Sequence, residues 1–337
     1  MNATEKQAVM HAPTNTVPLS IAEIGSFLAG GRTVTLSDRP CQRVKVARNG
    51  PDRIVDLNGD YITGQCYVQF ARLAQRHQPY PVMFWHGGAM TGVTWETTPD
   101  GRAGWQMYFL HQGYDTYVCD AHERGRAGWS PYPDIYKEAP IFRTSNEAWS
   151  LFRFGPGEGY CTAPDERVAF KNQQFPIDCF DQLAAQFVPR WTDHAEQTLA
   201  AYVEALKKTG PVVLISHSQG GNFALDIVQR VPELIKALVV IEPAAAPRHT
   251  EETLAKAASV PHLLIWGDFI DDAPLWQGYR QVVDPYVESL RRAGGRIDVF
   301  DLPSQGIRGN SHVPMMDANS DEVAALINDW LGSLDLE

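Results

Sequence analysis

From residue 81 onward, the chain alternates short apolar runs with segments of helical periodicity. Runs of four or five apolar residues between turn signals are typical of strands that are buried on both faces. Helical patterns at 193–208, 221–230 and 278–293 lie between such runs, and this alternation predicts βαβ units, helices on both faces and a mostly parallel central sheet. The strands expected in this part of the chain are 82–85, 116–119, 212–215, 237–241, 262–266 and 297–300.

The first part of the chain has a different pattern. Residues 1–20 are polar and interrupted by proline, so we expect a flexible N-terminal arm. Extended segments are expected at 43–47 and 63–71, and the alternating polarity of the second is typical of a half-buried antiparallel strand. Few α/β folds begin with antiparallel strands and continue with parallel ones, so this order limits the possible folds.

The segment 121–192 interrupts the alternation of strands and helices, because it is rich in proline, glycine and aromatic residues. A compact connection between a strand and a helix takes about 2–6 residues, so this segment is an insertion. Two interpretations stay open: a surface elaboration with its own small core, or a lid whose apolar inner face forms a pocket wall. The expected organisation is a core of 21–120 and 193–337 with a lid or cap at 121–192.

Composition and charge limit the function classes. Of the 337 residues, 44% are apolar and 20% charged, which is ordinary globular usage and excludes a disordered or fibrous chain. The formal charge of −11 repels phosphate backbones and anionic lipid, so neither a nucleic acid nor a membrane is an expected partner. A homodimer is plausible, because dimers are the commonest soluble oligomers.

The cysteines indicate whether a metal site or disulfides are expected, and the first residues indicate the expected cellular location. The five cysteines, Cys41, Cys66, Cys119, Cys161 and Cys179, lack zinc-ligand spacing, so neither a metal site nor a disulfide framework is expected. The first residues lack the basic and apolar regions of a signal peptide, and no apolar run approaches the length of a membrane span. We therefore expect a cytoplasmic protein, or a secreted one with room for one disulfide if a leader has been removed.

A candidate nucleophile follows the expected strand 212–215. The sequence Ser216-His217-Ser218-Gln219-Gly220 leads directly into a helical pattern. Small residues two positions before and after a serine permit a sharp strand-to-helix turn that exposes its Oγ atom near the free N–H groups of the helix. Five residues of this kind are a weak motif alone, but between a strand and a helix they indicate that Ser218 is a nucleophile.

A serine hydroxyl needs a base within hydrogen-bonding distance, and in this arrangement the base follows the nucleophile in the chain. Three histidines do so. His262 lies inside an expected strand and His249 in a polar loop, whereas His312 lies in a glycine-rich loop after the last strand. We therefore predict His312 as the general base.

The acid that would orient His312 has three candidates. Glu242 follows the strand after the nucleophile, at a carboxyl end beside Ser218, and we favour it. Asp268 and Asp271 follow the next strand, where Ile270 occupies the position at which an acid is more usual, and both stay open. Whichever carboxylate acts, it would hold the imidazole in the correct tautomer.

Two backbone N–H groups are needed to stabilise the oxyanion of a tetrahedral intermediate. One is expected from Gln219, directly after the nucleophile, and the other from Gly88 in the glycine-containing loop after strand 82–85. Nearby polar and aromatic side chains, Trp95, His86 and His217, are candidates for substrate binding. No metal or organic cofactor is needed for this chemistry.

Together these residues resemble an α/β-hydrolase. The segments 94–102 (TWETTPDGR), 124–126 (RGR), 152–156 (FRFGP), 216–219 (SHSQ) and 309–312 (GNSH) are similar to a small bacterial esterase subgroup of that superfamily. The resemblance runs from about residue 25 to the C-terminus. It implies an α/β-hydrolase fold and a Ser-His-Glu triad whose acid follows the strand after the nucleophile, which matches Glu242.

The leading hypothesis is therefore a serine hydrolase that cleaves a small-molecule carboxylic ester or lactone through an acyl-enzyme intermediate. Cleavage of a C–C or amide bond by the same residues is the alternative, because these reactions differ in leaving group and share the nucleophile. A non-catalytic ligand-binding protein of the same fold is a third hypothesis, which the Ser218 and His312 pair disfavours. The aromatic residues of the insertion suggest a substrate with an apolar part.

Overall fold

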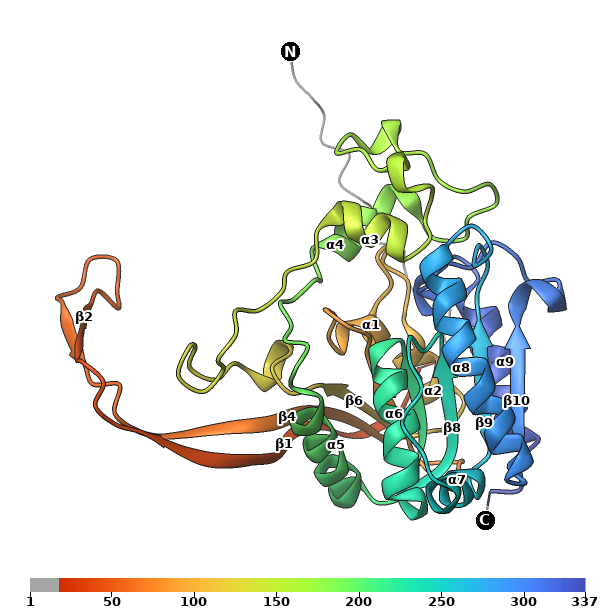
Figure 1. The fold of residues 1–337 in the computed structure, drawn as a ribbon, viewed down its shortest axis with the longest axis horizontal. Coiled ribbons are helices and arrows are strands. Elements are labelled where there is room, and N and C mark those ends of the chain that lie inside the picture. Colours follow the sequence, from red (N-terminus) through yellow and green to blue (C-terminus); the bar gives the residue numbers. More distant parts are fainter. Residues whose placement is uncertain (1–17, 337) are drawn as a thin grey trace.

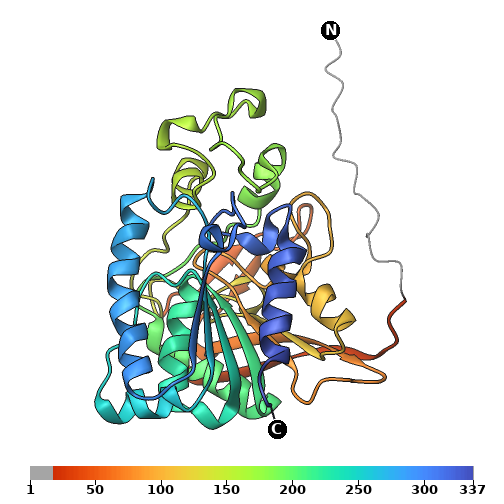
Figure 2. The same cartoon turned by 90° about the vertical axis from the view of Figure 1, so that its right-hand side faces the viewer.

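The computed structural model describes residues 18–336, which form an eight-stranded mixed sheet with helices on both faces (Figures 1 and 2). The strand order is β1-β4-β6-β5-β7-β8-β9-β10. Strands β6 to β10 of this order run parallel, while β4 is antiparallel to both β6 and β1. The predicted fold, a mostly parallel sheet preceded by antiparallel strands, is thereby confirmed.

The bounds of the elements follow the predicted runs from residue 81 onward. The strands are β1 (Ile21–Leu36), β2 (Gln42–Val44), β3 (Arg53–Val55), β4 (Gly59–Leu73), β5 (Val82–Trp85), β6 (Thr116–Asp120), β7 (Val212–His217), β8 (Ile235–Ile241), β9 (His262–Trp266) and β10 (Ile297–Asp301). The α-helices are α1 (Val93–Glu96), α2 (Trp105–His111), α3 (Ser145–Leu151), α4 (Phe180–Ala184), α5 (Ala195–Thr209), α6 (Gln219–Arg230), α7 (Glu251–Ala258), α8 (Pro274–Arg292) and α9 (Ser320–Gly332).

The sheet is buried on both faces, which explains the continuous apolar runs of its parallel strands. Alternate side chains of a strand point to opposite faces, and strand β5 shows this directly. Val82 and Phe84 join one hydrophobic cluster, with side chains of α2 and α9, whereas Met83 and Trp85 join the other, with side chains of α5 to α8. Two separate cores therefore fix the strands in place.

The N-terminal part differs from its prediction. The expected strand at 63–71 is the middle of the longer β4, and its partner β1 was not predicted. These two strands form a hairpin that extends well beyond the body of the molecule (Figure 1). The expected segment at 43–47 contributes only β2, which pairs with β3 near the hairpin tip and lies outside the central sheet. Most of the expected N-terminal arm, residues 1–17, lies outside the described residues.

The segment 121–192 lies beyond the carboxyl ends of the parallel strands, where it carries α3 and α4 (Figures 1 and 2). Its aromatic side chains Trp149, Phe154 and Phe180 belong to the same buried cluster as residues of β5 and α9. The insertion thus continues the core of the sheet instead of forming a separate one. Whether it acts as a lid stays a prediction.

Candidate active site

Ser218 occupies the tight turn that joins β7 to α6. Its backbone has φ 51° and ψ −117°, a strained conformation for a residue other than glycine. The Ser218 N–H donates to the carbonyl of Ile241 at 2.8 Å and holds the turn in place. A Cβ atom at Gly220 would lie 2.5 Å from the carbonyl oxygen of His86, so only glycine fits there. The turn therefore presents the serine at the amino end of α6, where backbone N–H groups lack helical partners.

His312 lies on the loop between β10 and α9, and it is nearly completely buried. Its Nδ1 atom lies 2.6 Å from Oε2 of Glu242, and its backbone N–H donates to the carbonyl of Phe152 at 3.0 Å. The ring packs against Trp276, with ring centroids 4.1 Å apart. Because a carboxylate can only accept hydrogen bonds, Nδ1 carries the proton and Nε2 is the basic nitrogen.

Burial has the largest effect on the pKa of His312, and it lowers that pKa to about 4 because the charged ring would lose its hydration. The charges of Arg153 and Arg143 act in the same direction. The hydrogen bond and the negative charge of Glu242 oppose the shift without cancelling it. The imidazole is therefore neutral at neutral pH and able to accept a proton.

Glu242 is the first residue after β8 and is completely buried. Its Oε1 atom accepts the Gly267 N–H at 2.6 Å, and its carboxylate forms a two-pronged ion pair with Arg153, including Nη1 to Oε2 at 2.9 Å. Burial alone would raise the pKa of this carboxyl, but the charge of Arg153 and the hydrogen bond to His312 outweigh it and lower the pKa to about 2. Glu242 is thus ionised and fixed in orientation.

The two other candidate acids do not contact the imidazole. The carboxylate of Asp268 accepts the N–H groups of Gly309 and Phe269, both at 2.8 Å, so it braces the loop that carries His312. Asp271 is exposed, and only its backbone carbonyl takes part in a hydrogen bond among residues 18–336. Of the three carboxylates considered from the sequence, the structure brings Glu242 to His312.

The glycine loop after β5 lies against the serine turn, as an oxyanion-binding loop would. A Cβ atom at Gly87 would come within 3.2 Å of Cβ of Ser218, and one at Gly88 would come within 3.2 Å of Oε1 of Gln219. Gln219 is the first residue of α6, so its backbone N–H is one of the free donors at that helix end. Gly88 and Gln219 line the same cavity as Ser218, and their role as oxyanion donors stays a prediction.

The three residues suggested for substrate binding have different surroundings. His217 lines the cavity in front of Ser218; its Nε2 donates to the carbonyl of His312 at 2.8 Å, and its Nδ1 has no partner within the described chain. Both ring nitrogens of His86 are taken by backbone groups of Gly87 and Ala121, so His86 holds the glycine loop. Trp95, expected at the pocket, is completely buried in the core beside Phe84, because helix α1 turns it toward the sheet.

A cavity of about 250 Å³ opens in front of Ser218. Within residues 18–336, no hydrogen bond joins the Ser218 hydroxyl to His312, although both line this space; such catalytic contacts often form only when a substrate is bound. The walls combine apolar and cationic side chains, and several come from segment 121–192. The lining residues are Gly88, Met90, Arg143, Glu147, Leu151, Phe152, Arg190, His217, Ser218, Gln219, Asn222, Ala244, Leu275, Trp276, Tyr279 and His312.

Two residues that support the site were not predicted from the sequence, Arg153 and Asp317. Arg153, quoted only as part of a family-like segment, has a completely buried side chain that pairs with Glu242 and also donates from Nε to the carbonyl of Asp268 at 2.8 Å. Asp317 accepts the N–H and the hydroxyl of Ser311 and a side-chain N–H of Asn310, at 2.7–3.0 Å. Asp317 therefore fixes the two residues before His312, and no spacing in the sequence signals either contact.

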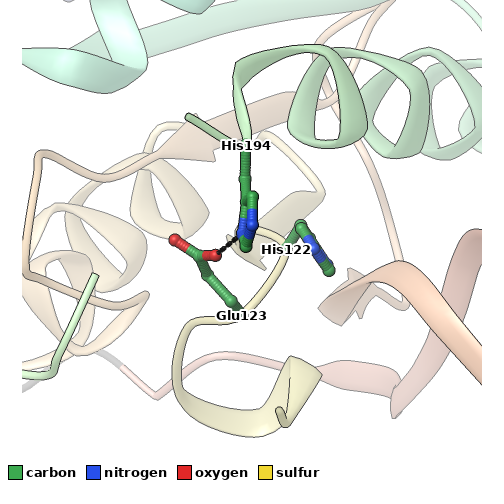
Figure 3. Close-up of side chains that lie close together, drawn as sticks. All are labelled: His122, Glu123 and His194. Carbon is green, nitrogen blue, oxygen red and sulfur yellow. Dashed lines mark hydrogen bonds and ion pairs between the residues drawn. The ribbon is translucent and has the colours of Figure 1, made fainter. Parts of the chain in front are cut away.

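A second polar cluster lies outside the cavity, where His122, Glu123 and His194 offer atoms within 4.8 Å of one another that could bind a metal ion (Figure 3). Figure 3 shows Glu123 directed at the His194 ring, with His122 beside that ring. However, the Glu123 carboxylate also pairs with buried Arg124 and accepts the Trp191 N–H at 2.8 Å. Because the Arg124 charge would oppose a cation, we interpret the cluster as an anchor for the end of segment 121–192.

The comparisons with known proteins agree with this architecture. No family model matches the chain. The fold itself defines the class: an α/β-hydrolase. A solved structure of a novel bacterial esterase is 33% identical in sequence, covers 96% of this chain and 99% of its own, and superposes with a TM-score of 0.79. The chain therefore belongs to the esterases of the α/β-hydrolase superfamily.

A curated relative bears on the cellular location. It is a probable secreted lipase from a fungal species (strain ATCC 74256), 26% identical over 82% of this chain and 88% of the relative. The expected cytoplasmic location gains no support from a relative that is named as secreted. Among residues 18–336, no helix has the length and apolar character needed to cross a membrane, and the five cysteines are unpaired.

Proposed function

We propose that this esterase hydrolyses a carboxylic ester or lactone through an acyl-enzyme intermediate, with Ser218 as nucleophile, His312 as general base and Glu242 as orienting acid. The names of the similar proteins, an esterase and a probable lipase, support the reaction class. The observation that carries the assignment of residues is the 2.6 Å contact between His312 Nδ1 and buried Glu242, because His312 lines the same cavity as the strained Ser218.

The acylation half of the reaction follows from these positions. With Nδ1–H of His312 donated to Glu242, Nε2 takes the proton of the Ser218 hydroxyl as Oγ attacks the carbonyl carbon. The carbonyl oxygen becomes an oxyanion, which the N–H groups of Gly88 and Gln219 would stabilise. His312 then gives its proton to the departing alcohol oxygen, and the acyl group is left on Ser218.

Deacylation repeats these steps with water as the nucleophile and Ser218 as the leaving group. A water molecule gives a proton to His312 Nε2 and attacks the acyl carbon, and the same N–H groups stabilise the second oxyanion. The acid is released when His312 returns the proton to Ser218 Oγ. We also propose that segment 121–192 covers the reacting atoms and limits water access, because Arg143, Leu151 and Phe152 form one wall of the cavity.

A kinetic experiment with 4-nitrophenyl acetate tests the proposal. We expect Ser218→Ala to lower kcat by about 10⁶-fold, as the loss of a serine nucleophile does in other enzymes. Ser259→Ala is the matched control, because Ser259 is exposed at the end of α7 and should leave hydrolysis unchanged. Intact-mass measurement after rapid acid quenching should find an acetyl group on the wild type.

Two results would contradict the proposal: full activity of Ser218→Ala, or a wild-type protein that hydrolyses none of a panel of acyl esters and lactones.

A further inference from the structure

Two arginines, Arg143 and Arg190, line the same cavity as Ser218 and His312. Both come from segment 121–192, and backbone hydrogen bonds hold their two strands of chain together: Ile141 N–H to the Arg190 carbonyl at 2.8 Å, and Arg190 N–H to the Ile141 carbonyl at 3.0 Å. These bonds hold the segments that carry the two arginines side by side, and the charge of Arg190 acts on Arg143.

The charge of Arg143 is only partly balanced. Its side chain is 3% exposed, and its Nη1 lies 3.1 Å from Oε1 of Glu147, whose side chain is 43% exposed and therefore well hydrated. Its Nε is buried and has no hydrogen-bond partner within the described residues. Burial, followed by the nearby charge of Arg190, lowers the pKa of Arg143 to about 10, so the group is still charged at neutral pH.

Arg190 has no ion-pair partner in the part of the chain that the structure describes. Its Nη1 lies against the oxyanion loop, 2.8 Å from where a Cβ atom on Gly88 would be. The neighbouring Arg124 is different, because Glu123 balances its charge. Among the cavity-lining residues, two arginines thus face a single carboxylate, that of Glu147.

We infer that the cavity selects esters that carry a carboxylate, and that Arg143 and Arg190 bind this group while Ser218 attacks the ester. This inference rests on the proposed hydrolase function. Arg143 is buried with only an exposed carboxylate as its ion-pair partner, and half-buried Arg190 has no ion-pair partner among residues 18–336, so an anionic ligand would be favourable here. The planar guanidinium also matches the two oxygens of a carboxylate. Because Arg190 lies beside Gly88, a short chain would separate the carboxylate from the reacting carbonyl. Leu151, Phe152 and Trp276 offer apolar walls for the remainder.

A pair of nearly isosteric substrates tests the inference: mono-4-nitrophenyl glutarate, which carries a carboxylate, and the neutral 4-nitrophenyl glutaramate. We expect kcat/KM to favour the anionic ester by roughly 10- to 100-fold, the value of one charge-assisted hydrogen bond. In Arg190→Gln and Arg143→Gln this ratio should fall toward one, and Arg190→Lys should retain part of it.

Arg296→Gln is the matched control, because Arg296 is an exposed arginine paired with Asp298 far from the cavity, and its removal changes the net charge equally. It should retain the wild-type ratio. Thermal unfolding of each variant identifies any that fail to fold. Calorimetry on Ser218→Ala gives a second measure that needs no turnover: glutarate should bind, glutaramide should bind more weakly, and Arg190→Gln should remove the difference.

The outcomes separate the two hypotheses. Equal kcat/KM for both esters, or a ratio that survives both arginine variants, would overturn the carboxylate preference and leave the hydrolase function intact. If neither ester nor any other is hydrolysed, the proposed function fails, and calorimetry alone then decides the anion site: absence of glutarate binding overturns it.

Discussion

The arginines on the two sides of the candidate active site differ in how far a carboxylate balances their charge. Behind His312, Arg153 is completely buried and both prongs of its guanidinium meet the carboxylate of Glu242. In front of Ser218, Arg143 pairs with one hydrated carboxylate and lies over the rings of Phe152 and Phe187. Arg190 has no ion-pair partner within residues 18–336. The arginine charge is thus balanced by a buried carboxylate behind His312 and only partly balanced in front of Ser218.

This difference separates positioning from binding. A matched buried pair fixes the geometry of its members, since removing either partner leaves an uncompensated charge. Arg153 therefore holds Glu242 ionised and aligned with His312. A partly balanced arginine beside a cavity still has N–H groups that can donate to a ligand, as the unpartnered Nε of Arg143 shows within the described residues. We therefore propose that Arg153 is a positioning residue, whereas Arg143 and Arg190 select the substrate.

The largest effect is expected from Glu242 on the rear side. Glu242→Gln should lower kcat roughly 10⁴-fold, because the amide no longer enforces the tautomer that leaves Nε2 basic. Asp271→Asn is the control, since Asp271 is exposed and does not contact His312. Steady-state kinetics on a neutral ester measures both, and a larger loss in the Asp271 variant would overturn the assignment of the acid.

Removal of Arg153 should affect both stability and the pH profile. Arg153→Met leaves Glu242 charged and unpaired, which is expected to destabilise the fold by about 3–5 kcal/mol. His312 is active only as the neutral base, so wild-type kcat/KM should fall as the pH drops through its pKa of about 4. The positive charge of Arg153 contributes to that low pKa, so its loss should move the acid limb to higher pH.

Arg167→Met controls for the loss of a buried arginine elsewhere, because Arg167 pairs with Asp181 and does not line the cavity. It should lower the melting temperature without moving the acid limb. Arg153→Lys, which retains the charge, should move the limb less than Arg153→Met. An acid limb that stays in place in Arg153→Met would refute the positioning role.

The smallest expected effect is on KM, and it tests which tryptophan lines the cavity in front of Ser218. Trp276 lines the cavity and packs on His312, whereas Trp95 is buried in the core. Trp95→Phe should lower stability by about 1–3 kcal/mol, the usual range for a core change, and leave KM within about twofold. Trp276→Phe should change KM more. Thermal unfolding and kinetics test the pair, and a KM effect confined to Trp95→Phe would contradict the described pocket.

The parallel part of the fold was predictable because its strands are buried on both faces. Runs such as Val212–Ile215 are apolar without interruption. The turn at Ser218 could be predicted from the small residues on either side of it. Strand β1 was missed because most of its side chains are exposed or half-buried, so its sequence lacks the continuous apolar run of the parallel strands. What makes β1 a strand is its pairing with β4, which a local sequence pattern does not reveal.

The site was predictable only where it lies at the ends of regular elements. Ser218, Glu242 and His312 each follow a strand, so their mutual approach could be argued from the sheet. Arg143, Arg153 and Arg190 lie in a segment without periodicity, and tertiary packing alone decides which charge each one meets. The prediction that Trp95 binds substrate failed for a related reason. Trp95 is close in sequence to the glycine loop, but its side chain is buried in the core and does not line the cavity.

The most direct test of the account is fluorophosphonate labelling followed by peptide mass spectrometry, on wild type, His312→Ala and Glu242→Gln. The probe reports activation of the serine and does not depend on the substrate preference of the front arginines. We predict stoichiometric modification of Ser218 in the wild type and much slower modification in both variants. Modification at another residue, or Ser218 labelling at an undiminished rate in His312→Ala, would contradict an active site built on Ser218, His312 and Glu242.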